Sequence, residues 1–160
     1  MTPGLTLRPV EPRDHAFVIE LNRLHEHLTA PMDEDRLLAL LAWAERAVVI
    51  DLEGSPAGFV FLFSAGTDYD SASYVELGRL FDEFTYLDRI VIDEAFHRRG
   101  LGTAVYDELE AQAVRRMVLE VNIDPPNEAS LAFHRARGYR GVAEFGPADH
   151  RVLQMSKELT

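Results

Sequence analysis

The chain has 160 residues, a formal net charge of −11 and no cysteine. Its length predicts a single domain over residues 1–160, and the absence of cysteine excludes disulfides, thiolate metal sites and a cysteine nucleophile. The acidic balance argues against nucleic acid as a partner, because binding to phosphates needs clustered cations, and it favours cationic small molecules. No apolar run is long enough for a membrane span, and the N-terminal residues lack the apolar core of a secretory signal. We therefore expect a cytoplasmic protein that binds no membrane.

The first half of the chain alternates between strand and helix patterns. Apolar side chains recur at helical spacing after the first strand and predict an amphipathic helix; they are Phe17, Leu21, Leu24 and Leu28. Asp33 is suited to cap a second helix, because its side chain can accept a hydrogen bond from the first turn. The predicted elements are a strand over 5–10, helices over 13–28 and 34–44, and strands over 47–52 and 57–63.

The second half begins with a polar, acidic segment over 64–83, which we expect to be a loop with room for a short helix. The elements predicted after it are a strand over 84–92, a helix over 100–115, a strand over 117–123, a helix over 127–138, and strands over 139–146 and 150–159. This order predicts a mixed sheet of the α/β (α+β) class, because it lacks the strict strand–helix alternation of a doubly wound fold.

The turn "HRRGLGT" (97–103) joins a strand to a helix and carries arginines and glycines. A helix N-terminus presents unpaired N–H groups and a partial positive charge. Glycine lets the backbone approach a phosphate closely, and Arg98 and Arg99 add fixed charge. The turn is therefore competent to bind a pyrophosphate, although a plain connection with solvated arginines has the same sequence. It is not a Walker loop, because no G-K-[ST] follows.

Three segments in order, "IVIDEAFHRRGLG", "LEVN" and "NEASLAFHRARGY", resemble the GNAT superfamily of acyl-CoA-dependent N-acyltransferases. The match is close over 84–140, and the element order fits from residue 5 to the end. The resemblance implies a mixed, mostly antiparallel sheet of about seven strands flanked by about four helices. It also implies acetyl-CoA as cosubstrate, no metal, and direct attack of an amine on the thioester through a tetrahedral intermediate.

By this resemblance, two segments and one asparagine would bind acetyl-CoA. The backbones of Ile90, Val91 and Ile92 would pair with the pantetheine arm, the amide near Val91 facing the thioester oxygen; the alternative is ordinary buried core. The pyrophosphate would be wrapped by Arg98, Arg99, Gly100, Leu101, Gly102 and Thr103. Asn127 would contact the CoA arm, and it is equally suited to be a helix N-cap.

The resemblance also implies a pair of proton-transfer residues. Glu120 lies on the strand face shared with Val118 and Asn122, where a carboxylate can take the proton of the attacking amine; the alternative is a solvated glutamate. His134 stands where the family has the tyrosine that protonates the leaving thiolate. An imidazolium or water can do the same, Tyr86 and Tyr106 are other sources of a phenol, and a histidine without a role is the alternative. His97 is a second departure, at a position where the family has Gln or Arg.

The acceptor site in this family lies between the first two helices and the loop after the third strand. Those segments contain Asn22, His25, Glu26, Asp68, Tyr69, Asp70 and Glu76. Their acidity points to a cationic acceptor, either a small-molecule amine or a peptide N-terminus. Relatives pair through their last strands, which implies a homodimer. Two rival hypotheses are a non-catalytic acyl-CoA-binding module and a nucleotide-binding regulatory module.

Overall fold

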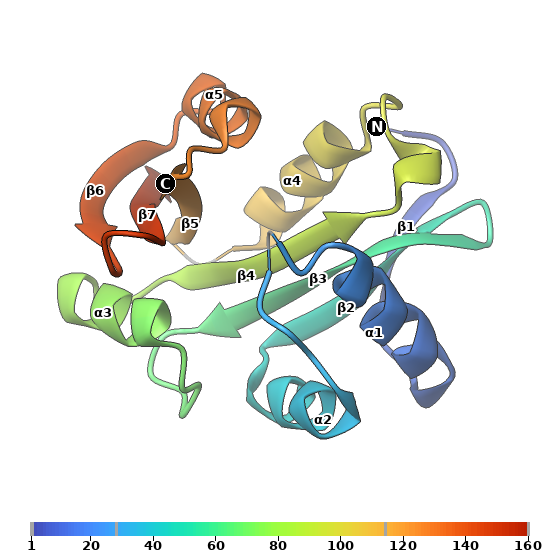
Figure 1. The fold of residues 1–160 in the computed structure, drawn as a ribbon. Coiled ribbons are helices and arrows are strands. Elements are labelled where there is room, and N and C mark those ends of the chain that lie inside the picture. Colours follow the sequence, from blue (N-terminus) through green and yellow to red (C-terminus); the bar gives the residue numbers. More distant parts are fainter. Residues whose placement is uncertain (1, 28, 114, 160) are drawn as a thin grey trace. The chain divides into compact units, whose positions relative to one another are not determined.

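The computed structural model describes residues 2–27, 29–113 and 115–159. The chain divides into two compact units. Figure 1 labels their helices and strands. Unit 1 comprises Met1–Phe63 with Asp88–Gln112, and unit 2 comprises Ser64–Leu87 with Ala113–Thr160. In the described part of the chain, no helix has the length and apolarity that crossing a membrane would require.

The described residues form one sheet of seven strands, in the order β1-β2-β3-β4-β5-β7-β6. The pairs β1–β2, β2–β3, β5–β7 and β6–β7 are antiparallel. The pair β4–β5 is parallel, with Thr85 opposite Met117 and Tyr86 opposite Val118. The prediction of a mixed, mostly antiparallel α/β sheet is confirmed. Five α-helices are described where about four were expected.

Unit 1 follows the predicted pattern closely. Its elements are β1 (Leu5–Pro9), α1 (His15–Leu24), α2 (Glu34–Trp43), β2 (Arg46–Leu52), β3 (Ser55–Ser64), the end of β4 (Thr85–Ile92) and α4 (Leu101–Gln112). Asp33 caps α2 as predicted, since its Oδ1 accepts a hydrogen bond from the Arg36 N–H at 2.8 Å. Glu53 and Gly54 have φ of 54° and 85°, the geometry of a tight hairpin between β2 and β3.

The first predicted helix is shorter than its apolar spacing indicated. A 3-10 turn over Pro12–Asp14 precedes α1, which ends at Leu24. The Nδ1 of His25 lies 3.0 Å from the Leu21 carbonyl oxygen. The side chain thereby bonds one of the last carbonyls of the helix, which have no intrahelical donors. Leu24 is 56% exposed, so it does not extend the buried face. Leu28 and Val114, which the predicted helices included, lie outside the described residues.

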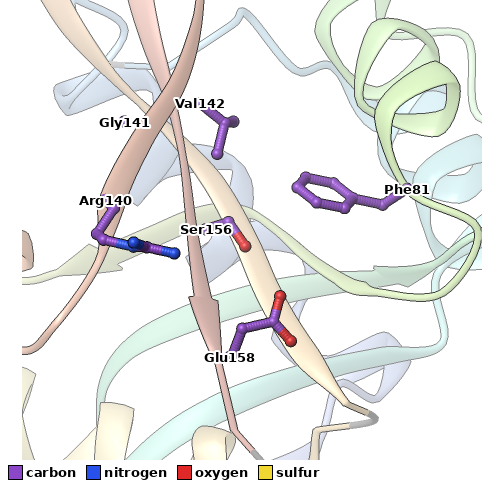
Figure 2. A pocket seen from close by; sticks show the side chains of 6 residues that line it. All are labelled: Phe81, Arg140, Gly141, Val142, Ser156 and Glu158. Carbon is purple, nitrogen blue, oxygen red and sulfur yellow. The ribbon is translucent and has the colours of Figure 1, made fainter.

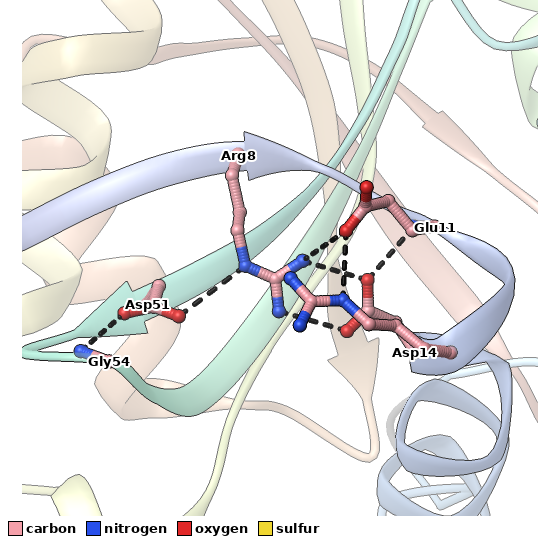
Figure 3. A network of polar contacts seen from close by, with 6 residues as sticks. Arg8, Glu11, Asp14, Asp51 and Gly54 are labelled. Carbon is pink, nitrogen blue, oxygen red and sulfur yellow. Dashed lines mark hydrogen bonds and ion pairs between the residues drawn. The ribbon is translucent and has the colours of Figure 1, made fainter.

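A network of polar contacts ties β1 to the turn before α1 (Figure 3). Arg8 donates two hydrogen bonds to Asp14, from Nη1 to Oδ2 at 2.8 Å and from Nη2 to Oδ1 at 2.9 Å. The Glu11 N–H donates to the same carboxylate at 2.8 Å, and Arg8 Nε donates to Asp51 on β2 at 3.4 Å. The hydrogen bond from Arg8 holds the pKa of Asp14 below its ordinary value. A nearly buried carboxylate is thereby fully paired.

Unit 2 begins with the polar segment over 64–83. A loop with a short helix was expected there, and the structure has α3 (Ala72–Leu80), which is nine residues long and is capped by Ser71. Tyr74 anchors the segment before it, because its hydroxyl donates to the Ser64 carbonyl at 2.6 Å and accepts from the Thr67 N–H at 2.9 Å. The other elements of unit 2 are β5 (Arg116–Asp124), α5 (Glu128–Ala136), β6 (Arg140–Phe145), β7 (Arg151–Glu158) and the start of β4.

We expect Asp14→Asn to lower the free energy of unfolding by about 1.5–3 kcal/mol at neutral pH, because the charge-assisted pair with Arg8 is lost. Urea denaturation at pH 7 measures this. Asp149→Asn is the matched control, since it removes an exposed carboxylate in a loop, and its effect should stay within about 0.5 kcal/mol.

The same pair predicts a pH dependence. The folded-state pKa of Asp14 lies below its ordinary value of 3.8, so the pair stabilises the protein above that value and the stabilisation is lost as the pH falls through the folded pKa. The difference between the wild type and Asp14→Asn should therefore shrink on acidification. A difference that stays constant down to acid unfolding would contradict the assignment.

Candidate active site

The end of β4 presents its backbone in a defined direction. The Asp93 N–H donates to the Ala57 carbonyl on β3 at 2.8 Å. Backbone groups of alternate strand residues point the same way, so those of Val91 also point toward β3. A Cβ placed on Gly58 would overlap the Val91 carbonyl oxygen, which places that oxygen against β3 independently. The N–H and C=O groups of Ile90 and Ile92 therefore point away from β3.

His97 completes a hydrogen bond to this strand end. A 3-10 turn over Glu94–Phe96 follows β4 and is capped by Asp93, whose Oδ1 accepts from the Ala95 N–H at 3.1 Å. The turn returns His97 to the strand, where its Nε2 lies 2.8 Å from the Ile92 carbonyl oxygen. Because a carbonyl can only accept, Nε2 carries the proton. His97 is exposed, so a ligand can reach this contact.

The turn that follows has the backbone geometry of an anion site. Arg98 and Gly100 both have left-handed φ, 64° and 72°, and Arg99 between them does not. Alternation of this kind turns successive N–H groups toward one side and forms a concavity for an anion. α4 begins at Leu101, where the first-turn N–H groups have no intrahelical acceptor. The sequence therefore builds converging backbone donors at this turn.

The glycines of the turn face open space. No heavy atom lies within 4 Å of a Cβ built on Gly100 or on Gly102. Gly100 still needs its left-handed φ, whereas Gly102 lies in α4 without a positive φ. Neither packing nor conformation in unit 1 therefore requires glycine at position 102, and a bare backbone there leaves room for a ligand.

In unit 2, Glu120 lies half-buried on β5 and accepts a short hydrogen bond. The Tyr86 hydroxyl on β4 donates to Glu120 Oε1 at 2.6 Å. The parallel register explains the contact, since Tyr86 is opposite Val118 and Glu120 is the next residue on the same face. Sequence reasoning treated Tyr86 only as a phenol that could not be placed. No pattern within the strand marks Tyr86, because its partner on β5 is set by the register of the two strands.

His134 is buried in α5, so it does not lie on the solvated surface of that helix. It is 6% exposed, and the rings of Phe133 and Tyr139 contact it edge-on at centroid distances of 5.2 and 5.4 Å. Its Nδ1 lies 2.7 Å from the Ser130 carbonyl oxygen, one turn earlier. Nδ1 therefore donates and carries a proton, and any further proton exchange of this ring occurs at Nε2.

Asn127 is the N-cap of α5. Its side-chain oxygen accepts from the Ser130 N–H at 3.2 Å, and its own N–H donates to the Asn122 carbonyl at 2.9 Å. The structural reading of this residue, which the sequence left open beside a contact to CoA, is thus confirmed. The hydrogen bond to Asn122 also fixes the start of α5 to the end of β5.

The residues expected near the acceptor divide into structural and exposed groups. Asn22 is fully buried, and its amide donates to the Ala30 carbonyl at 2.9 Å and accepts from Arg89 at 3.1 Å. It therefore fixes the segment between α1 and α2. Tyr69 is buried in unit 2, and Glu76 pairs with Arg79 at 2.8 Å. Glu26, Asp68 and Asp70 are exposed, and His25 is half-buried.

A hollow of about 320 Å³ on unit 2 is lined by other residues (Figure 2). They are Phe81, Arg140, Gly141, Val142, Ser156 and Glu158. Arg116 stacks over the Phe81 ring at 4.4 Å and pairs with Glu158 at 2.8 Å. No residue expected to bind or react lines this hollow. Among the described residues, no group of three or more His, Cys, Asp or Glu side chains is arranged to hold a metal ion.

Comparison with known proteins identifies the fold. The model of the Acetyltransferase (GNAT) family matches residues 13–139. No curated protein matches the sequence significantly.

Solved structures of similar fold cover nearly the whole chain. An acetyltransferase from Thermus thermophilus has 23% identity and a TM-score of 0.69, with 96% of each chain covered. Ard1 from Thermoplasma volcanium has 20% identity and a TM-score of 0.72, with 97% of each covered. yncA from Salmonella typhimurium, solved with its cofactor acetyl-CoA, has 20% identity and a TM-score of 0.66, covering 98% of this chain and 95% of its own.

Proposed function

Because the chain belongs to the GNAT acetyltransferase family, we propose that it is an N-acetyltransferase that moves acetyl from acetyl-CoA to a primary amine. The amine attacks the thioester directly, through a tetrahedral intermediate and without an acyl-enzyme. The observation that carries this proposal is the anion site at the start of α4, where Arg98 and Gly100 adopt left-handed φ and two glycines face open space. Such a backbone suits the pyrophosphate of a coenzyme A thioester.

Binding of acetyl-CoA is assigned to the residues that the resemblance implied, with one refinement. Residues 98–103 hold the pyrophosphate through backbone N–H groups, and Arg98 and Arg99 add charge. Along β4, Ile90 and Ile92 supply the groups for the pantetheine arm, because the Val91 groups point toward β3. Val91 contributes by keeping the strand against β3. Asn127 contributes through its amide group beside its role as N-cap.

Glu120 takes the proton of the attacking amine. An alkylammonium cannot attack a thioester, so a base must remove a proton before or during attack. Glu120 is half-buried, which shields it from bulk water while leaving it accessible. Its hydrogen bond from Tyr86 orients it.

His134 protonates the leaving thiolate. Its Nδ1 is held by the Ser130 carbonyl, so the proton that is transferred comes from Nε2 of the imidazolium. The rings of Phe133 and Tyr139, which contact the imidazole edge-on, fix its orientation.

The acceptor is a small-molecule amine or a peptide N-terminus. The chain has a net charge of −11, and the segment before α3 carries Asp68 and Asp70. Two structures of similar fold have peptide or protein substrates. Naa50 from Arabidopsis thaliana, at 11% identity, was solved with a bisubstrate analogue, CoA-Ac-MVNAL, and an Escherichia coli enzyme at 18% identity is the ribosomal-protein-S18-alanine N-acetyltransferase. Both the acidity and these structures favour a cationic amine.

The proposal is tested by thiol release from acetyl-CoA in the presence of a panel of amines and peptides, together with calorimetry against acetyl-CoA, CoA, ATP and NAD. We expect acetyl-CoA to bind and at least one amine to accelerate thiol release. Binding of CoA without turnover of any amine would instead support a non-catalytic acyl-CoA-binding module. Binding of ATP or NAD in preference would support a nucleotide-binding regulator.

We expect Gly102→Ala to weaken CoA binding by at least about tenfold, because the added Cβ would occupy the room that the bare backbone leaves for the ligand. Stability should stay unchanged or rise, because alanine favours a helix and no protein atom within 4 Å opposes its Cβ. Calorimetry and thermal unfolding measure the two effects. Gly78→Ala is the matched control, since Gly78 also lies in a helix with nothing within 4 Å of its Cβ. It should raise stability by a similar amount without changing CoA binding. Equal CoA affinity in both variants would refute the site at α4.

We expect Glu120→Gln to lower kcat by about 100-fold or more with little change in the Kd of acetyl-CoA, because glutamine cannot accept the proton. Glu53→Gln, which changes an exposed glutamate in the hairpin between β2 and β3, serves as control. His134→Phe should lower kcat and remove a titration from the pH profile of kcat. If neither Glu120→Gln nor His134→Phe slows transfer, the assigned acid and base are wrong.

A further inference from the structure

A row of polar side chains crosses one face of the sheet in unit 2. Tyr86 on β4 bonds Glu120 on β5, and Glu120 is directly opposite Gln154 on β7. Side chains of residues opposite each other lie on the same face. Gln154 is fully buried, and its Nε2 donates to the Ser73 hydroxyl at 2.9 Å and to the Ser73 carbonyl at 3.2 Å. The row therefore ends at α3, which packs on this face.

Tyr86 is rigidly held within this row. It is 1% exposed, and its ring lies 5.6 Å from that of Tyr74 and 6.4 Å from that of Tyr69. Tyr74 is itself fixed by hydrogen bonds to Ser64 and Thr67. A phenol packed in this way has only its hydroxyl torsion left to adjust. Packing therefore holds the Tyr86 hydroxyl in place, 2.6 Å from Glu120 Oε1.

We propose that Tyr86 is a positioning residue for the base of the acetyl-transfer reaction, an inference that rests on the proposed function of Glu120. The Tyr86 hydroxyl donates to Glu120 Oε1, which orients the carboxylate and stabilises its ionised form. A hydrogen bond from a phenol to a carboxylate is short and charge-assisted, and it favours the charged state over the protonated one. Tyr86 keeps its own proton throughout. The proton that the amine loses goes to Glu120 and then to water.

The other polar side chains on this face of unit 2 are either uncharged or paired with other groups. Arg116 is on the same face of β5, but it pairs with Glu158 at 2.8 Å and donates to the Glu83 carbonyl at 2.9 Å. The β7 residues on this face nearest the row, Gln154 and Ser156, are uncharged, and α3 contributes the uncharged Ser73. Removing the contact from Tyr86 is therefore expected to change the state of the carboxylate.

The test is Tyr86→Phe, which removes one oxygen and keeps the ring that packs against Tyr69 and Tyr74. We expect kcat to fall by about 10- to 100-fold, as for the loss of one hydrogen bond to a charged group, with the Kd of acetyl-CoA unchanged. We also expect the acid limb of the kcat/KM profile to move to higher pH, because the ionised carboxylate loses its donor. A residue with only a structural role would lower activity without moving that limb.

Two controls separate the effect from a loss of packing. Tyr106→Phe removes the hydroxyl of another buried tyrosine and should leave the acid limb in place. In a Glu120→Gln background, Tyr86→Phe should cause no further loss of activity, because the carboxylate on which the Tyr86 hydroxyl acts is already absent. Additive losses in the double variant, or an acid limb that does not move in Tyr86→Phe, would overturn the inference.

A readout that needs neither activity nor a variant is the NMR titration of the wild type. The ¹³Cζ shift of Tyr86 should change with the same midpoint as the Glu120 carboxyl; a Tyr86 signal insensitive to that titration would overturn the contact. If the wild type acetylates no amine, the proposed function fails, and with it the catalytic meaning of the contact. If the wild type is active and the profile of Tyr86→Phe is unchanged, only the positioning role fails.

Discussion

The alternating direction of backbone groups along the end of β4 is the constraint on which the proposed acetyl-CoA site of unit 1 depends. The Asp93 N–H is bound by Ala57, and Gly58 admits the Val91 carbonyl where any side chain would collide with it. These two contacts direct the backbone N–H and C=O groups of Val91 and Asp93 toward β3. Ile90 and Ile92 then present their backbone groups in the other direction. The direction in which the following turn leaves the strand is set by the capping of Asp93 and by His97 on the Ile92 carbonyl.

In unit 2 the corresponding constraint is to keep the half-buried carboxylate of Glu120 in its ionised form. A carboxylate removed from water is disfavoured unless hydrogen-bond donors replace the water. Tyr86 supplies such a donor, and its ring packs against those of Tyr69 and Tyr74. Asp14 in unit 1 shows the structural version of the same principle, with Arg8 as the donor. The two carboxylates differ in exposure, since Asp14 is 4% exposed and Glu120 is half-buried. That difference favours a structural role for the first and a chemical role for the second.

The rival hypothesis of a binding module rested on His134 in place of a tyrosine. The burial of His134 between Phe133 and Tyr139, with Nδ1 fixed on Ser130, gives the ring a defined tautomer. An ordered imidazole with Nε2 as its exchanging nitrogen is suited to proton transfer. The substitution is thus compatible with chemistry, and the proposal of catalysis does not require a tyrosine at this position. Asn127 is the opposite case. It was expected to contact acetyl-CoA, and its role as the N-cap of α5 is by itself a sufficient structural reason for the residue.

The sequence by itself determined the elements and the family, because both are written in local patterns. Helical spacing and the Asp33 cap placed α2, glycine and arginine marked the turn before α4, and three short motifs in order identified the GNAT family. Local patterns left the bounds of α3 open, since its buried residues Tyr74 and Leu77 lie among polar neighbours and gain their stability from contacts outside the helix. Tertiary structure alone decided that the Tyr86 hydroxyl donates to Glu120. It also decided that the backbone groups of Val91 point toward β3 while those of Ile90 and Ile92 point away. Strand register and strand direction join residues more than 30 positions apart, and no spacing within either segment encodes which partner it will meet.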